Sequence, residues 1–258
     1  MAGPFGKSMK KILLFLPAYN EAENITSLLE RVQGCVDEYS LNLSVLVAND
    51  GSSDNTLNMV ETFKKKAGYK IEIIDIQPNQ GLANAMRLGI EYGVKNLNQD
   101  DLFVAMDADD SHSPFLIKRM NDQINEGSDI VIASRFQPGA RISGLSGFRK
   151  FTSVGAGLIF KFFVDIPHVK DYTCGFRAYR VSLLQDAIKK YDGKLIEEKG
   201  FACMAEILLK LSLLNPIIHE VPMILRYDRK GGASKMNVYN TIRQTLYLIR
   251  NFKRLQKN

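Results

Sequence analysis

The stretch 101-DLFVAMDADDSHSP-114 sets an apolar run directly against a cluster of carboxylates. Leu102 to Met106 form a continuous apolar segment, as expected of a strand that is buried on both faces. Asp107, Asp109 and Asp110 follow at once. Carboxylates this close repel one another, so the arrangement is costly unless a cation compensates it. We therefore predict a buried strand that ends by presenting Asp107 and Asp109 to a metal ion, with Asp110 as an ordinary cap.

The same order of strand and helix recurs on both sides of this stretch. Apolar runs typical of strands lie at 11–17, 43–50, 70–76 and 129–136, and helical periodicity lies at 25–32, 55–66, 81–94 and 113–124. Asn20 with Glu23 resembles a capping box, and Ser113 with Pro114 is typical of a helix start. The alternation predicts an α/β fold with a mostly parallel central sheet flanked by helices.

The pattern loosens after Phe136. Residues 137–147 are polar, glycine-rich and basic, which predicts a flexible loop, and mixed strand and helix signals follow to about Tyr227. The last stretch has helical periodicity, with an apolar face that includes Met236, Tyr239 and Ile249. We divide the chain into a flexible leader (1–10), a catalytic domain (11–234) and an amphipathic basic C-terminal helix (235–258).

The net charge of +6 is concentrated in that tail. Six of the 34 Lys and Arg residues lie within 235–258, which has no acidic residue, and 28 basic residues remain against 28 acidic ones elsewhere. Such a tail suits an anionic membrane surface or nucleic acid. A helix packed on the core with a solvated basic face has the same sequence pattern. Binding to a membrane-embedded partner protein is a further alternative for the tail.

Other sequence features narrow the functional class. The three cysteines are scattered, which favours a reducing compartment and no zinc or disulfide framework. We see no secretory signal and no apolar run long enough to cross a bilayer. The phosphate-binding motifs of Walker nucleotidases and dinucleotide dehydrogenases are missing, as is the nucleophile elbow of hydrolases. His112 is either a surface residue or a group that contacts substrate.

Polar segments follow all five predicted strands. They are PAYNE (17–21), NDGSSDNT (49–56), QPNQG (77–81), DADDSHSP (107–114) and SRF (134–136). Ligands bind at the carboxyl ends of the strands in open parallel sheets. We call this edge of the sheet its mouth. Carboxylates there suit the binding of a metal-bound phosphate, because Mg²⁺ or Mn²⁺ takes one or two carboxylates together with substrate phosphates.

In this order, the segments PAYNE, NDGSSDNT, NQGLANA, DADD and SRF resemble the GT-A glycosyltransferases of family 2. The later segments DYTCGFRAYR (171–180), EEKGFACMAEILLKL (197–211) and VPMILRYDRKGGASKM (221–236) resemble the dolichyl-phosphate or polyprenyl-phosphate mannose synthase branch. The resemblance covers about residues 10 to 237. It implies an inverting, metal-dependent transfer of a hexose from a sugar nucleotide, with GDP-mannose as first choice and UDP-glucose as second.

The resemblance also implies roles for single residues. Pro17, Tyr19 and Glu21 would contact the nucleoside, and Asp50 would lie near the base or ribose, although Asn49 replaces a usual aspartate. Asp107, Ala108 and Asp109 would form the DXD motif that holds metal and diphosphate. Ser111 is a third candidate ligand, shorter than the glutamine that is frequent there.

The basic residues would hold the phosphates. Arg229 would close over the donor diphosphate, and Arg135, Arg149 and Ser153 would lie around the phosphates of donor and acceptor. Arginine suits this role because its planar fork binds phosphate oxygens in pairs. The acceptor would be a polyprenyl or dolichyl phosphate, and the enzyme would be peripheral on the cytoplasmic face of a membrane.

Two other functions stay open at this point. A family 2 enzyme with a sugar-hydroxyl acceptor would need an aspartate base, for which Asp171 is the only candidate we can assign. A nucleic-acid-binding protein would use the basic tail, but its aromatic residues follow helical spacing and the rest of the chain is neutral, so we expect no nucleic-acid partner.

Overall fold

The computed structural model describes residues 10–144, 163–229 and 247–254. Seven strands form one sheet in the order β3-β2-β1-β4-β7-β5-β8. The bounds of these strands are β1 (Ile12–Ala18), β2 (Leu43–Asp50), β3 (Lys70–Ile76), β4 (Leu102–Ala105), β5 (Ile130–Ser134), β7 (Arg177–Arg180) and β8 (Ile218–Pro222). The prediction of a mostly parallel α/β sheet is confirmed, because all neighbouring pairs in this sheet are parallel except those of β7.

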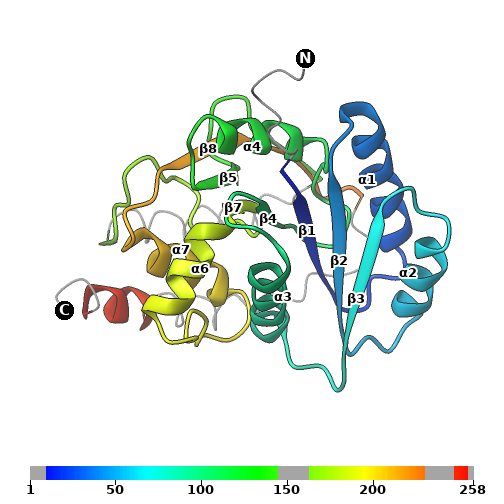
Figure 1. The fold of residues 1–258 in the computed structure, drawn as a ribbon, viewed down its shortest axis with the longest axis horizontal. Helices are drawn as coiled ribbons and strands as arrows, with labels where there is room; N and C mark the ends of the chain where they lie inside the picture. The colour runs from blue at the N-terminus through cyan, green and yellow to red at the C-terminus, as the bar shows by residue number, and fades with distance from the viewer. Residues whose placement is uncertain (1–9, 145–162, 230–246, 255–258) are drawn as a thin grey trace, which may run out of the picture.

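Helices cover the sheet along its length. They are α1 (Ile25–Tyr39), α2 (Thr56–Lys64), α3 (Leu82–Asn96), α4 (Leu116–Asn125), α6 (Val181–Lys190) and α7 (Ala202–Ser212). Figure 1 shows α1 and α2 beside the β2–β3 end of the sheet and α6 and α7 at the opposite end. α3 packs closely on the sheet because Gly89 has no side chain, since a Cβ there would lie 2.4 Å from the Phe15 ring. None of the helices in the described ranges combines the length and apolar character needed to span a bilayer.

Two predicted helix starts are wrong. α1 begins at Ile25 after Asn24, and Asn20 has a positive φ of 53° and belongs to the preceding loop. α4 begins at Leu116, and a turn in which the Leu116 amide donates to the Ser113 carbonyl precedes it. In the loop of Asn20 the local capping pattern was outweighed by tertiary contacts, which the next subsection describes. The apolar face predicted for α1, which includes Leu28, Leu29 and Val32, is buried as expected.

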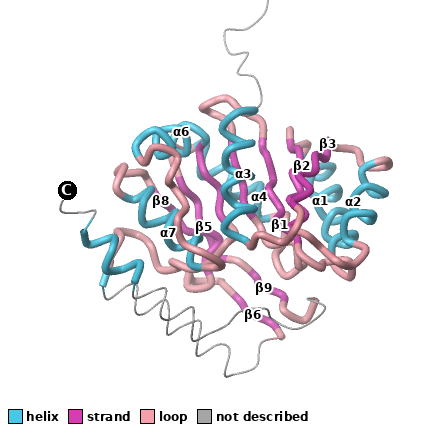
Figure 2. The backbone as a smooth tube through the Cα atoms, turned by 90° about the horizontal axis from the view of Figure 1, so that it is seen from below, coloured by secondary structure: helices cyan, strands magenta, loops and turns pink. Residues whose placement is uncertain are grey.

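The stretch predicted as a loop at 137–147 contains a short strand. β6 (Arg141–Ser143) pairs in parallel with β9 (Ile224–Arg226) to form a second, two-stranded sheet. Figure 2 shows this small sheet outside the main one, on the side toward which β1 ends. β9 is held there because the Arg226 amide donates to the Ser111 carbonyl at 2.9 Å. The small sheet therefore adjoins the loop that follows β4, residues 107–114, which we call the acidic loop.

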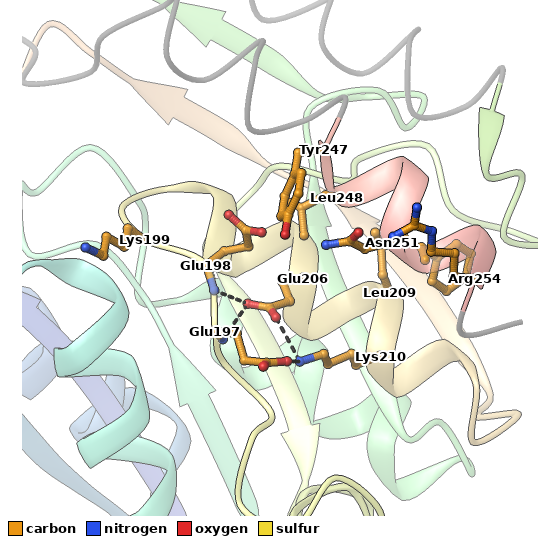
Figure 3. Close-up of a pocket in the computed structure, with 11 residues that line it drawn as sticks. Glu197, Glu198, Lys199, Glu206, Leu209, Lys210, Tyr247, Leu248, Asn251 and Arg254 are labelled. Carbon is orange, nitrogen blue, oxygen red and sulfur yellow. Dashed lines mark hydrogen bonds and ion pairs between the residues drawn. The ribbon is translucent and has the colours of Figure 1, made fainter. Parts of the chain in front are cut away.

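The described part of the C-terminal tail is helical at residues 247–254. Leu248, Ile249 and Phe252 are buried, whereas Arg250 and Lys253 are exposed. Figure 3 shows Tyr247, Leu248, Asn251 and Arg254 facing α7 and the segment before it, and a cavity of about 550 Å³ lies between these elements. This part of the helix thus packs on the body, with Arg250 and Lys253 exposed and Arg254 at the cavity. The rest of the predicted helix, 235–246 and 255–258, and the leader 1–9 lie outside the described residues.

Candidate active site

The loops after β1 and β2 are joined by hydrogen bonds at the mouth of the sheet. The Ser53 amide donates to Asn20 Oδ1 at 2.8 Å, and the Asn20 amide donates to Ser52 Oγ at 3.0 Å. The Glu21 amide donates to Thr56 Oγ1 at 2.8 Å. These contacts explain why Asn20 leaves the helix: its side chain bridges two loops. They also bring the segment with Pro17, Tyr19 and Glu21 beside the segment that begins at Asn49.

Asp50 is buried and anchors the loop that precedes α3. Its carboxylate accepts hydrogen bonds from the amides of Gln80 (2.8 Å) and Gly81 (2.7 Å) and from Asn79 Nδ2 (3.0 Å). Neighbouring Asn49 donates to Asp75 Oδ1 at 2.7 Å, while its own Oδ1 is buried without a protein partner. Asn49 and Asp50 therefore shape the loop that follows β2, and Asn49 Oδ1 is a buried hydrogen-bond acceptor in that loop.

The three aspartates of the acidic loop after β4 differ in exposure and in their partners. The Asp107 side chain is 40% exposed, whereas Asp109 is buried and its Oδ1 accepts from Ser111 Oγ at 2.6 Å and from the Ser111 amide at 3.1 Å. Asp110 is in an ion pair with Arg31 and accepts from Ser27 Oγ at 3.0 Å. The prediction that Asp110 is an ordinary cap is therefore wrong: it attaches the acidic loop to α1.

His112 and Gly175 flank the Asp107 carboxylate. His112 is buried, with Nδ1 3.9 Å from Asp107 Oδ2, and its ring lies 5.3 Å from that of Phe176. A Cβ on Gly175 would lie 3.2 Å from Asp107 Oδ1. The interpretation of His112 as a surface residue is wrong, because the residue is buried and its ring packs against Phe176, just before β7.

Arg135 lies just past β5 and is bound by Asp171. The Arg135 guanidinium donates to both carboxylate oxygens of Asp171, at 2.8 and 2.5 Å, and to Thr173 Oγ1 at 2.6 Å. Burial alone would raise the pKa of Asp171, but the charge of Arg135 and its hydrogen bonds lower that pKa below its usual value. The same pairing raises the pKa of Arg135 against the effect of burial. Sequence reasoning missed this pair, because nothing local links residues 36 positions apart.

The remaining basic candidates are only partly described. Arg229 is exposed, three residues beyond Arg226, and its amide donates to the Arg226 carbonyl at 3.1 Å. Because the Arg226 amide contacts Ser111, the chain that carries Arg229 begins beside the acidic loop. Arg149 and Ser153 lie outside the described residues, so their predicted roles stay predictions.

The family model for glycosyl transferase family 2 matches residues 14–187, which include all of these loops except the one with Arg229. The chain belongs to glycosyl transferase family 2. As a member of that family it is a glycosyltransferase, and the resemblance noted in its motifs is confirmed.

Curated relatives of this family 2 glycosyltransferase share one kind of name. The chain is 27% identical to the polyprenol monophosphomannose synthase of Mycolicibacterium smegmatis over 93% of its own length and 86% of the relative's. It is 30% identical to the undecaprenyl-phosphate mannosyltransferase of Micrococcus luteus over 88% of both chains. It is also 30% identical to the dolichol-phosphate mannosyltransferase of Pyrococcus furiosus, a longer protein of which it spans 59%.

Solved structures of low identity share the fold. Glucosyl-3-phosphoglycerate synthase from Mycobacterium tuberculosis, in complex with Mn²⁺, UDP and phosphoglyceric acid, superposes with a TM-score of 0.65 at 17% identity. The match covers 94% of this family 2 chain and 78% of the other. S. aureus TarS (residues 1–349) superposes with a TM-score of 0.58 at 18% identity over 94% of this chain and 65% of the other.

The donor set of the acidic loop fits a Mg²⁺ or Mn²⁺ ion. No group of three or more His, Cys, Asp or Glu side chains suited to a metal occurs among the described residues. A pair of carboxylates, one of them partly exposed at the mouth, is instead the arrangement by which such ions bind together with substrate phosphates. Ser111 Oγ lies close by, but it donates to Asp109, and its predicted place among the ligands stays a prediction.

Proposed function

We propose that this enzyme transfers a hexose from a sugar nucleotide to a polyprenyl phosphate, with mannose from GDP-mannose as the first choice. The observation that carries the proposal is the agreement of three relatives, each named for mannosyl transfer to a polyprenyl-type phosphate, over 88–93% of the chain. UDP-glucose is the second donor to test, since structural neighbours were crystallised with UDP and Mn²⁺ or Mg²⁺.

In the proposed reaction, Asp107 and Asp109 hold the divalent ion, which would supply positive charge to the departing diphosphate. Arg229 closes over the same diphosphate, while the loops with Pro17, Tyr19, Glu21 and Asp50 hold the nucleoside. Ala108 lies between the two aspartates with its small side chain buried, and we assign its backbone to the donor site.

The roles of the residues around the acceptor follow from the charge of its phosphate. A lipid phosphate is ionised at neutral pH, so the attacking oxygen needs no strong base and has only to be held in line with the anomeric carbon. We assign that role to Arg135, Arg149 and Ser153. The Asp171 pair fixes the Arg135 guanidinium at the end of β5, which reduces the side-chain entropy lost when a phosphate binds.

The same pair weakens the alternative of a sugar-hydroxyl acceptor. That reaction needs a carboxylate base that can take a proton near pH 7. Asp171 was the only candidate, and its carboxylate is fully buried, accepts several hydrogen bonds and has a lowered pKa. Such a group is a poor base, so the phosphate acceptor is favoured.

A donor and acceptor matrix tests the proposed function. Radiolabelled GDP-mannose or UDP-glucose is incubated with undecaprenyl phosphate or with free sugar acceptors, and the organic-phase product is counted. We expect lipid-soluble product from GDP-mannose and undecaprenyl phosphate, and we expect EDTA to suppress it and added Mn²⁺ to restore it. Transfer to sugar hydroxyls alone, or full activity in EDTA, would contradict the proposal.

We also propose that the tail holds the enzyme on the cytoplasmic face of a membrane, where its acceptor resides. Arg250 and Lys253 are exposed on the helical segment, and their cations lie 5.9 Å from the Tyr247 ring and 5.2 Å from the Phe163 ring. Tyr247 and Phe163 are themselves 50% and 43% exposed. Basic and aromatic side chains together suit the interface of an anionic bilayer.

Reversing these charges tests the membrane contact without removing the buried residues of the helix. Each basic residue near an anionic surface contributes about 1 kcal/mol, so losing two gives about 30-fold weaker binding, and the double variant Arg250→Glu/Lys253→Glu, which also adds repulsion, is expected to bind phosphatidylglycerol vesicles at least about 30-fold more weakly. The matched control is Lys64→Glu/Lys65→Glu, two exposed residues at the end of α2, on the far side of the molecule. Equal vesicle flotation of both variants would show that the tail is not the membrane contact.

A further inference from the structure

The carboxylate of Asp107 is enclosed by two groups that lie outside the acidic motif. On one side, His112 Nδ1 is 3.9 Å from Asp107 Oδ2. On the other side, a side chain at Gly175 would come within 3.2 Å of Asp107 Oδ1. The Asp107 side chain is partly exposed, and these two neighbours limit the orientations that its carboxylate can take.

The His112 ring is held in place but its Nδ1 has no hydrogen-bond partner. The residue is only 5% exposed, its ring lies tilted at 49° against Phe176, and its carbonyl accepts from Arg31 Nη1 at 3.3 Å. Nδ1 is buried and unsatisfied. A buried polar atom without a partner costs free energy, and the Asp107 carboxylate, 3.9 Å away, lies about 1 Å beyond ordinary hydrogen-bond distance.

Gly175 lies in a turn that hydrogen bonds hold in place. The fully buried Arg177 donates to the carbonyls of Met204 (2.5 Å) and Tyr172 (2.8 Å), which attaches this turn to α7. The Cys174 amide donates to Asp171 Oδ1 at 3.0 Å. Besides Asp107, a Cβ on Gly175 would meet the Met204 methyl group at 3.9 Å. A Cβ on Gly175 would therefore push the Asp107 carboxylate away by a few tenths of an ångström.

We propose that His112 and Gly175 are positioning residues that set the Asp107 carboxylate for the divalent ion. Gly175 leaves the room that Oδ1 occupies, and His112, in the tautomer with a proton on Nδ1, donates to Oδ2 once the carboxylate turns toward a bound cation. Partners of this kind orient metal ligands and raise affinity for the ion. The inference rests on the proposed metal role of Asp107 and adds residues from two other segments to that site.

The first test compares His112→Asn with His112→Leu. Asparagine keeps an N–H close to the place of Nδ1, whereas leucine removes it. Leucine is preferred to alanine because His112 also lines a cavity of about 330 Å³, which alanine would enlarge. Mn²⁺ binding in the presence of GDP is measured by electron paramagnetic resonance of the free ion. We expect a dissociation constant 10- to 100-fold higher for His112→Leu and within about threefold of wild type for His112→Asn.

The second test uses Gly175→Ala with Gly34→Ala as its control. A Cβ on Gly34, within α1, would make only ordinary contact with Phe115 at 3.6 Å. Gly175→Ala is expected to weaken Mn²⁺ binding at least about 10-fold while GDP binding without metal stays within about threefold, and Gly34→Ala should change neither.

The outcomes separate this inference from the function on which it rests. If wild type binds Mn²⁺ and all variants bind it equally, with only the melting temperature changed, the positioning role is overturned and the metal site stands. If wild type itself binds no Mn²⁺ with or without GDP, the metal role of Asp107 fails and the inference with it.

Discussion

Replacing Asp109 with alanine is expected to lower the rate of sugar transfer by at least about 10³-fold. The diphosphate that departs carries negative charge, and losing an electrostatic contact to such a group commonly costs about 10²- to 10³-fold, with a metal ligand at or above the upper end. The loss of the Asp109 Oδ1 contacts to Ser111 also releases the backbone of the acidic loop. Initial rates with the donor and acceptor identified above, at saturating Mn²⁺, measure the effect.

Asp122→Asn is the control for this variant. Asp122 lies on α4 shortly after the acidic loop and pairs with Lys118 at the surface, so its loss should leave the transfer rate unchanged. Near-normal transfer by Asp109→Ala, particularly with EDTA present, would show that the carboxylate pair does not act through a metal.

Replacing Asp171 with asparagine is expected to lower the free energy of unfolding by about 3–5 kcal/mol at pH 7. Its side chain is fully buried and that of Arg135 is 12% exposed, so the variant leaves a guanidinium without its counter-charge in a place that water hardly reaches. Asparagine keeps the shape of the side chain, which isolates the effect of charge. Urea denaturation gives the difference, and Asp122→Asn, which breaks an exposed pair, should cost no more than about 1 kcal/mol.

The pH dependence of that difference has a defined sign. The pKa of Asp171 is lower in the folded protein than its ordinary value of about 3.9, so ionisation of this group stabilises the fold. The stabilisation is complete above about pH 5 and is lost as the pH falls through the folded pKa. The difference between wild type and Asp171→Asn should thus be constant from pH 5 to 8 and shrink below about pH 4. A difference that grows on acidification would contradict the assignment.

The sequence alone determined the first half of the fold and the location of the mouth. β2 (Leu43–Asp50) and β3 (Lys70–Ile76) have the predicted bounds, and the polar segments that follow the strands lie in adjoining loops. Such features can be predicted because strand and helix periodicities are local, and because parallel strands bring their carboxyl ends to one edge of the sheet. The acidic pair could be found for the same reason, since Asp107 and Asp109 directly follow a buried strand.

Only the tertiary structure decided which residues surround that pair. β7 inserts antiparallel between β4 and β5, and with it come Gly175 beside Asp107, Phe176 against His112 and Asp171 under Arg135. These contacts join residues tens of positions apart. Their energies arise from desolvation and packing, which exist only once distant segments meet, so no local pattern reports them. The chemistry of the site could be predicted from neighbouring residues along the chain, whereas the groups that orient it depend on neighbours in space.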